Sequence, residues 1–276
     1  MKRVLVLLAL VAANVYAWTL SEPRDLTVSF LDVGEGDAVF IQAPGSQVLI
    51  DGGPVGSGVL RGIGARVPFF DRSLDAVIET TPTASESGGL IGVFDRYHIA
   101  NFLTSPVLGD TKTASMLARA AANEGSETGT LARGARILFG GGAYADVLSP
   151  NANTPKLDAH SGALILRIVY GRTSFLLSSE APQKTEQALA AEDGAALKSD
   201  VALAGEHGSK NASAPSFVAV ASPAYAVLSY GCTNRFGHPA TSTLDAFRSV
   251  GATLLNTCED GAVTFQSDGQ KVLNVP

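Results

Sequence analysis

The chain has 276 residues, of which 46% are hydrophobic and 17% charged; this excludes disorder, collagen and a coiled coil and allows one large domain. Two cysteines are too few for a disulfide scaffold or a four-cysteine zinc module, and four histidines make a histidine-rich dinuclear metal site hard to build. The net charge of −6, without any run of Lys or Arg, argues against tight nonspecific DNA binding, which needs clustered cations.

The amino-terminal segment, residues 1–20, has the pattern of a signal peptide or a signal anchor. Lys2 and Arg3 precede an apolar run over residues 4–13, and the sequence Val15-x-Ala17 is typical of a signal-peptidase site. Three interpretations stay open here: a cleaved signal, an uncleaved anchor whose basic residues stay inside, and a buried core segment.

The first two interpretations place the rest of the chain outside the cytoplasm, either exported or anchored to the membrane. In that arrangement residues 21–25 form a polar linker and residues 26–276 form the folded domain. The apolar stretch over residues 4–20 would then be the membrane contact of the chain.

Beyond the linker, hydrophobic alternation and turn residues predict strands first and then strands that alternate with helices. The expected strands are 26–31, 38–42, 47–50, 74–78, 101–104, 136–139, 145–148, 163–170, 173–177, 201–204, 224–229, 253–256 and 262–267. The expected helices are 58–70, 88–94, 111–123 with Asp110 as its cap, 182–192 and 242–250. This order predicts an α/β fold in which two mixed sheets pack together with helices outside.

Several sequence blocks occur in an order that points to a known family. Residues 30–38 read Phe-Leu-Asp-Val-Gly-Glu-Gly-Asp-Ala and residues 49–54 read Leu-Ile-Asp-Gly-Gly-Pro. Further blocks follow at 173–180, 204–209, 234–239 and 260–269. Together they resemble the metallo-β-lactamase-like domain of ComEC-type competence proteins, although Glu35 stands where that family usually has Gln. The resemblance implies a four-layer αββα sandwich that follows a membrane helix.

The main metal motif of that family, His-x-Asp-x-Asp-His-x-Gly-Gly, corresponds to residues 81–89 of this chain. Its ligand positions are here Thr81, Thr83, Ser85 and Glu86. Zinc is bound by imidazole, thiolate or carboxylate groups at about 2.0–2.3 Å, and neutral hydroxyls are poor substitutes.

The later ligand positions are also altered. Ser179 and Glu180 stand where the resemblance places a bridging aspartate, and Glu206 with His207 replaces a pair of histidines. His238 is retained within a Gly-His-Pro sequence.

The ionisable groups expected near this pocket are therefore Asp51, Glu86, Glu180, Glu206, His207 and His238. In one interpretation the dinuclear site is lost, no metal cofactor remains although the family implies zinc, and the protein is a pseudoenzyme. In the other, the carboxylates and one or two imidazoles hold a single divalent ion such as manganese or calcium. Without a cation, the three glutamates should repel one another, so that their pKa values rise, or else the pocket should hold water, Lys or Arg.

The remaining polar candidates have simpler interpretations. Asp32 and Asp37 flank glycines, which favours structural roles in turns. His98 and His160 match no motif position and are expected to be surface or core histidines.

Cys232 and Cys258 each follow a predicted strand, and a helix joins the two strands. A right-handed crossover would make these strands parallel, often as neighbours, with both cysteines at the same sheet edge. In an exported protein this favours a disulfide. A pair of buried thiols is the alternative.

These patterns lead to two main functional hypotheses and to a third, a domain whose residual pocket binds a small ligand without turnover. The first is an exported or membrane-anchored, catalytically inactive domain, with an unidentified protein partner in the cell envelope, in DNA uptake. Direct nucleic-acid binding should then be weak or absent. The second is a metal-dependent hydrolase or phosphodiesterase with a rebuilt, carboxylate-rich site.

Overall fold

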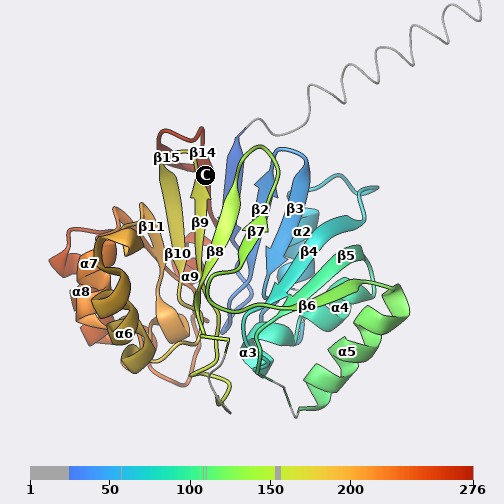
Figure 1. Ribbon diagram of the computed structural model, residues 1–276, viewed down its shortest axis with the longest axis horizontal. Helices are drawn as coiled ribbons and strands as arrows, with labels where there is room; N and C mark the ends of the chain where they lie inside the picture. The colour runs from blue at the N-terminus through green and yellow to red at the C-terminus, as the bar shows by residue number, and fades with distance from the viewer. Residues whose placement is uncertain (1–24, 57, 108, 110, 153–156, 276) are drawn as a thin grey trace, which may run out of the picture.

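The computed structural model describes residues 25–56, 58–107, 109, 111–152 and 157–275. It forms two β-sheets that face each other, with helices covering the outer face of each sheet (Figure 1). The expected α/β, four-layer αββα architecture is therefore confirmed. The expectations for residues 1–20 and for most of the linker lie outside the described residues.

The larger sheet has eight strands and the smaller sheet has seven. In spatial order the larger sheet contains β15 (Val272–Val275), β14 (Val263–Ser267), β1 (Leu26–Phe30), β2 (Val39–Ala43), β3 (Ser46–Ile50), β4 (Ser73–Glu79), β5 (His98–Thr104) and β6 (Glu127–Thr130). The smaller sheet contains β13 (Thr253–Asn256), β12 (Tyr225–Leu228), β11 (Val201–Leu203), β10 (Thr173–Leu177), β9 (Ile165–Tyr170), β8 (Tyr144–Ser149) and β7 (Arg136–Leu138).

Helices α2, α4 and α5 cover the larger sheet, and α6, α7 and α8 cover the smaller one (Figure 1). The α-helices of the described residues are α2 (Gly58–Gly64), α3 (Ala84–Ser87), α4 (Leu90–Phe94), α5 (Lys112–Glu124), α6 (Gln183–Asp193), α7 (Pro215–Ala221), α8 (Thr241–Ser249) and α9 (Thr257–Asp260). Two 3₁₀ turns, η1 (Gly194–Leu197) and η2 (Gly205–Gly208), complete the set. Within the described ranges, no helix combines the length and the apolar character needed to cross a membrane.

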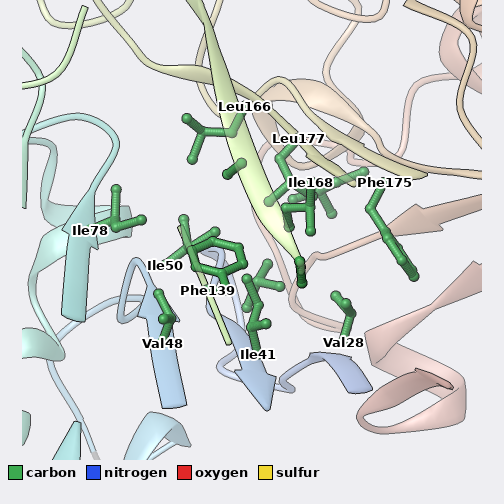
Figure 2. Packing of buried hydrophobic residues seen from close by; sticks show 14 of the residues in the cluster. Val28, Ile41, Val48, Ile50, Ile78, Phe139, Leu166, Ile168, Phe175 and Leu177 are labelled. Carbon is green, nitrogen blue, oxygen red and sulfur yellow. The ribbon is translucent and has the colours of Figure 1, made fainter. Parts of the chain in front are cut away.

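The main hydrophobic core lies between the two sheets, where inward-facing residues of both interdigitate (Figure 2). Val28, Ile41 and Ile50 from the larger sheet pack towards Phe175 and Leu177 from the smaller one. Because alternate residues point to opposite faces of a strand, Phe40 and Leu49 instead pack under the helices of the larger sheet. Each sheet is therefore buried on both faces, by the other sheet and by helices. This packing holds the sheets, and the loops at their edges, in place.

The structure departs from the expected elements where tertiary contacts decide the outcome. The helix expected over 88–94 begins at Leu90 as α4, and the short helix α3 before it was not expected. Gly89, directly before α4, packs so closely against Gly52 that a Cβ atom would lie 2.0 Å from the Gly52 carbonyl oxygen. The helix expected over 58–70 ends at Gly64. The cap of α5 is Thr111, whose hydroxyl accepts a hydrogen bond from the Ala114 amide; Asp110 lies outside the described residues.

The strands β6 and β15 were not expected from the sequence. Both are edge strands with mostly exposed or half-buried residues, so they lack the alternation that marks a strand with one buried face. The short helices α7 and α9 were also not expected.

Candidate functional site

The candidate site lies where parallel strands of both sheets end. Asp51 follows β3 and Thr80 follows β4, and these two strands are parallel neighbours. Ser179 follows β10 in the facing sheet, and its hydroxyl lies 2.5 Å from the Thr80 hydroxyl. Thr80 donates both its amide and its hydroxyl to the Asp51 carboxylate, at 2.8 and 2.6 Å. A chain of hydrogen bonds therefore connects the two sheets at this edge.

His207, in the turn after β11, stands among three buried carboxylates. Its Nε2 atom lies 3.1 Å from Glu180 and 3.4 Å from Glu86, and its Nδ1 atom lies 3.5 Å from Asp37. The His207 side chain is only 7% exposed and that of Glu86 is fully buried. One imidazole ring thus occupies the centre of an acidic cluster.

Several carboxylate oxygens of this cluster lack hydrogen-bond donors within the part of the chain that the structure describes. Among the described residues, neither oxygen of Asp37 and neither oxygen of Glu86 accepts a hydrogen bond. Buried charged groups without partners are costly, because they have given up hydration without replacement. Asp37, Glu86 and His207 also offer ligand atoms that all lie within 4.8 Å of one another, which is close enough to surround one metal ion.

Burial changes the protonation of the acids. It raises the pKa of Glu86 well above its ordinary value, and the nearby Asp37 charge raises it further, while His207 opposes the shift. Burial also raises the pKa of Asp51, against the hydrogen bonds from Thr80. The pKa of Glu206 is raised by partial burial and by the charge of Glu180. The pKa values of Glu86 and Glu206 thus shift in the direction that repulsion among the glutamates predicts, although burial is the largest cause.

The expectation is wrong for Glu180. Burial would raise the pKa of this carboxyl, but the imidazoles of His160 and His207 outweigh burial and lower it to about 2. Burial would lower the pKa of His207, but the carboxylates of Asp37, Glu180 and Glu86 together raise it well above the ordinary histidine value. The cluster therefore favours a charged His207 paired with an ionised Glu180.

Glycines bring the loops of the site close enough for this arrangement. A Cβ atom on Gly36 would lie 2.2 Å from the Ser85 carbonyl oxygen, so only glycine allows the β1–β2 loop to reach α3. The Gly52 amide donates to the Glu86 carbonyl at 2.7 Å, and the Gly53 amide donates to the Asp37 carbonyl at 2.8 Å. These contacts hold Asp37 and Glu86 beside each other.

Four residues of the site have a left-handed backbone, with φ values of 58° for Asp51, 45° for Ser179, 44° for Glu206 and 56° for His207. Non-glycine residues adopt this region rarely, and they keep it only where the surroundings impose it. The backbone of the site is thus held in a specific, strained geometry at the ends of β3, β10 and β11.

The side chains at the motif positions over 81–86 lie in different surroundings. The hydroxyl of Thr81 is turned away from the cluster and donates to the Ala159 carbonyl at 2.7 Å. The hydroxyls of Thr83 and Ser85 lie 3.2 Å from each other at the start of α3. Of these positions, Glu86 enters the cluster.

His238 and Glu35 form a second pair at the rim, with His238 Nδ1 2.7 Å from Glu35 Oε1. Glu35 also accepts the Gly231 amide at 2.8 Å, and the Phe236 ring stacks on His238. The rings of His207 and His238 have their centres 6.2 Å apart. His238 is therefore held by a carboxylate from the β1–β2 loop, beside the buried cluster.

Sequence reasoning missed Thr80, which binds Asp51, and Glu35, which binds His238. It also missed two ionisable residues at the cluster. Asp37 was interpreted as a turn residue, but its side chain faces His207, whereas Asp32 does cap the turn at the Gly34 amide. His160 was interpreted as a surface or core histidine, but its Nδ1 atom lies 3.2 Å from Glu180. The position of Asp37, directly after Gly36 and before a buried strand, is the one signal in the sequence that could have indicated it.

The expected disulfide is present between Cys232 and Cys258, with Cα atoms 5.0 Å apart. The parallel neighbours β12 and β13 carry these residues to one edge, as the crossover argument required.

The dinuclear zinc centre that the resemblance implies does not fit the residues present. Such a centre needs several imidazole or carboxylate ligands around each ion and an open position for water. Here Thr81 is committed to a backbone carbonyl, His238 is paired with Glu35, and His207 already contacts the Glu180 carboxylate at 3.1 Å. The group of Asp37, Glu86 and His207 has the donor chemistry for one divalent ion at most.

Two curated proteins are similar to this chain in sequence. It is 27% identical to ComE operon protein 3 of Bacillus subtilis (strain 168) over 264 residues, which is 87% of this chain and 33% of that protein. It is 34% identical to Competence protein ComA of Neisseria gonorrhoeae over 109 residues, which is 40% of this chain and 16% of that protein. The chain thus spans a third or less of either relative. No protein-family profile matches it.

Solved structures share the fold at low sequence identity. The metallo-β-lactamase fold protein YhfI from Bacillus subtilis has a TM-score of 0.52 at 13% identity, covering 83% of this chain and 95% of that one. The metallo hydrolase Igni18 from Ignicoccus hospitalis has a TM-score of 0.56 at 14% identity, covering 87% and 98%. Zn²⁺-bound PqqB from Methylobacterium extorquens has a TM-score of 0.53 at 14% identity, covering 83% and 86%.

Proposed function

Since the chain is a metallo-β-lactamase-like domain related to those of competence proteins, we propose that it is a catalytically inactive accessory of DNA uptake in the cell envelope. In this proposal the domain is exported or membrane-anchored, and it binds a protein partner rather than hydrolysing a substrate. The fold is kept, and the cluster around His207 stands in place of a metal centre.

The observation that carries the proposal is the position of the His207 ring. It contacts Glu180, Glu86 and Asp37 at 3.1–3.5 Å, so both of its ring nitrogens face carboxylates that a metal ion would need as ligands. An imidazole in this place supplies the positive charge that the buried carboxylates require. It supplies no electrophile for a phosphoester and no acidic water.

The remaining parts of the proposal have separate support. A disulfide favours an oxidising compartment, which agrees with export. The relatives named as competence proteins support a place in DNA uptake. The net charge of −6 argues against strong direct contact with DNA, so a protein partner is the simpler role.

The proposal is tested by phosphodiesterase assays with added zinc, manganese or calcium, on DNA and on bis(p-nitrophenyl) phosphate. We expect no turnover above the metal-only background with any of these ions. A matched variant restores the family motif as T81H/T83D/S85D/E86H and tests whether the missing donors are the reason. Metal-dependent turnover by the wild-type chain that is abolished in His207→Ala would contradict the proposal.

A second candidate is a domain that holds one divalent ion. The oxygens of Asp37 and Glu86, which accept no hydrogen bond among the described residues, favour it. A donor set of carboxylates with a single imidazole is better suited to manganese than to zinc. Equilibrium dialysis against manganese would then give one ion per chain, lost in Asp37→Asn and retained in Asp32→Asn, an exposed aspartate of the same loop. Equal, negligible binding by all three proteins would exclude this candidate.

A further inference from the structure

One end of the sandwich, opposite the candidate site, presents two aromatic rings to solvent. Phe69 and Phe70 are 84% and 72% exposed, and their rings contact each other edge to face at 5.4 Å. Exposed aromatic pairs of this kind are uncommon on the surface of a soluble domain and mark contact sites.

The turn that carries these rings is braced, which keeps them pointing outward. The Asp71 amide donates to the Pro68 carbonyl at 2.9 Å, and the Asp71 carboxylate accepts hydrogen bonds from Gln47 at 2.6 Å and from the Ser73 hydroxyl at 3.0 Å. The bonds to Gln47 and Ser73 anchor the turn to β3 and β4.

The topology places this turn where the chain enters the fold. Strand β2 is antiparallel to both β1 and β3, and β3 is parallel to β4, so β1, β3 and β4 all run in the same direction. Leu26 and Ser73 therefore begin their strands at the same end of the sheet, whereas Asp51 and Thr80 follow the opposite ends. We call the end at which β1 and β4 begin the entry end (Figure 1).

In the membrane-anchored interpretation, the chain leaves the bilayer next to the entry end. The apolar stretch over residues 4–20 stops six residues before Leu26. At about 3.5 Å per residue, a fully extended linker reaches roughly 20 Å. A bilayer that holds residues 4–20 therefore lies within reach of the entry end, where β1 begins.

Exposed cations lie at the same end. Arg172 and Lys271 are in the turns after β9 and β14, and Lys198 precedes β11. Thr173, beside Arg172, bonds to Ser267, the residue that pairs with Leu26, so these turns belong to the entry end. The neighbouring Asp268 accepts the amides of Gln270 and Lys271. Cations near an anionic lipid surface add to the binding of aromatic side chains.

We propose that the entry end rests on an anionic lipid bilayer, with Phe69 and Phe70 inserted at the interface and the His207 cluster directed away from the membrane. The inference rests on the proposed membrane location of the amino-terminal segment, and it is independent of the proposed inactivity. It assigns a bilayer-facing surface to residues 68–71 and gives the domain a fixed orientation.

The test uses the full chain reconstituted into vesicles of phosphatidylcholine and phosphatidylglycerol, with and without brominated acyl chains. Trp18 is the one tryptophan of the sequence, so Trp18→Phe provides a silent background. Phe70→Trp then reports on the entry end, Phe69→Trp repeats the measurement if the first variant fails to fold, and Phe236→Trp is the matched control. Phe236 is also exposed, at 60%, but it lies in the loop that carries His238 at the site end.

We expect Phe70→Trp and Phe69→Trp to show blue-shifted emission that brominated lipid quenches, and Phe236→Trp to show neither effect. If the chain floats with the vesicles but the entry-end and site-end reporters are quenched equally or not at all, the inference is overturned and the membrane anchor stands. If the chain does not float with vesicles, both are overturned.

Discussion

At the scale of single residues, the site is defined by one imidazole among buried carboxylates, and in our proposal its charge takes the place of a metal. His207 is surrounded by Asp37, Glu86 and Glu180, and each is buried. Removing one partner from a buried ion cluster leaves the remaining charges uncompensated. The loss of folding free energy is then much larger than the net stabilisation that the intact cluster provides.

We therefore expect His207→Ala to lower the free energy of unfolding by about 3 kcal/mol or more near neutral pH. Urea denaturation of the full chain measures this difference. His98→Ala is the matched control, because His98 pairs with Glu124 on the surface, where its side chain is 67% exposed. The control should lose no more than about 1 kcal/mol. Equal small losses in both variants would show that His207 does not neutralise the cluster.

A buried acid away from the cluster gives a pH dependence of known sign. Burial raises the pKa of Glu186 to about 7 from its ordinary 4.5, against hydrogen bonds that include the Ala214 amide. Between these pKa values the folded protein keeps a proton that the unfolded chain releases. The contribution of Glu186 to stability is therefore greatest below about pH 4.5, falls as the pH rises, and is lowest above about pH 7.

We expect Glu186→Gln to be more stable than the wild type at about pH 8, by at most about 3 kcal/mol, and to lose this advantage near pH 4. The glutamine keeps one oxygen for the Ala214 amide. Thermal denaturation across this pH range gives the measurement, with Glu192→Gln, on the exposed side of the same helix, as the control. A gain that does not change with pH would rule out the burial of an ionisable carboxyl as its cause.

At the scale of elements, the site depends on close approach of the β1–β2 loop to α3. Gly36 allows this approach, since a Cβ atom there would lie 2.2 Å from the Ser85 carbonyl oxygen and 2.7 Å from the Pro54 side chain. A backbone oxygen cannot move aside as a flexible side chain can. The contact between the loop and α3 is therefore a fixed part of the fold.

Gly36→Ala should accordingly destabilise the protein by about 1–3 kcal/mol and displace Asp37 from His207. Chemical denaturation gives the first effect, and the His207 ring resonances in NMR give the second. Gly64→Ala is the control, because no atom lies within 4 Å of a Cβ built there. The close packing would be refuted if both alanine variants were as stable as the wild type.

Element prediction from the sequence succeeded where burial alternates and failed where tertiary contacts decide. Val28 and Phe30 alternate with polar residues and mark β1, whereas β6 is an edge strand whose residues give no such pattern. Gly89, directly before α4, contacts Gly52, which lies 37 positions earlier in the chain. Local sequence carries no signal for such a contact.

The same limit applies to the candidate site. Glu86, Glu180 and His207 could be proposed because they stand at motif positions, and the structure brings them together. Asp37 and His160 approach the cluster only after distant loops have packed, and Thr81 turns towards Ala159 for the same reason. The sequence thus predicted several residues that belong to the site, but it could not predict where each side chain points.

At the scale of the whole molecule, the sandwich has two functionally different ends. The end where β3, β4, β10 and β11 finish carries the buried cluster around His207. The entry end carries exposed aromatic rings and cations beside the chain segment that we propose to lie in the membrane. A domain built in this way would present its site end to partners in the envelope while the entry end fixes its orientation.

The zinc stoichiometry of the purified full chain tests this interpretation most directly. The protein is dialysed to equilibrium against excess zinc, desalted, and measured by inductively coupled plasma mass spectrometry together with the His207→Ala variant. We expect no stoichiometric zinc in either protein, because Thr81, Thr83 and Ser85 cannot replace the missing ligands. Two tightly held zinc ions per wild-type chain would contradict the loss of the metal centre.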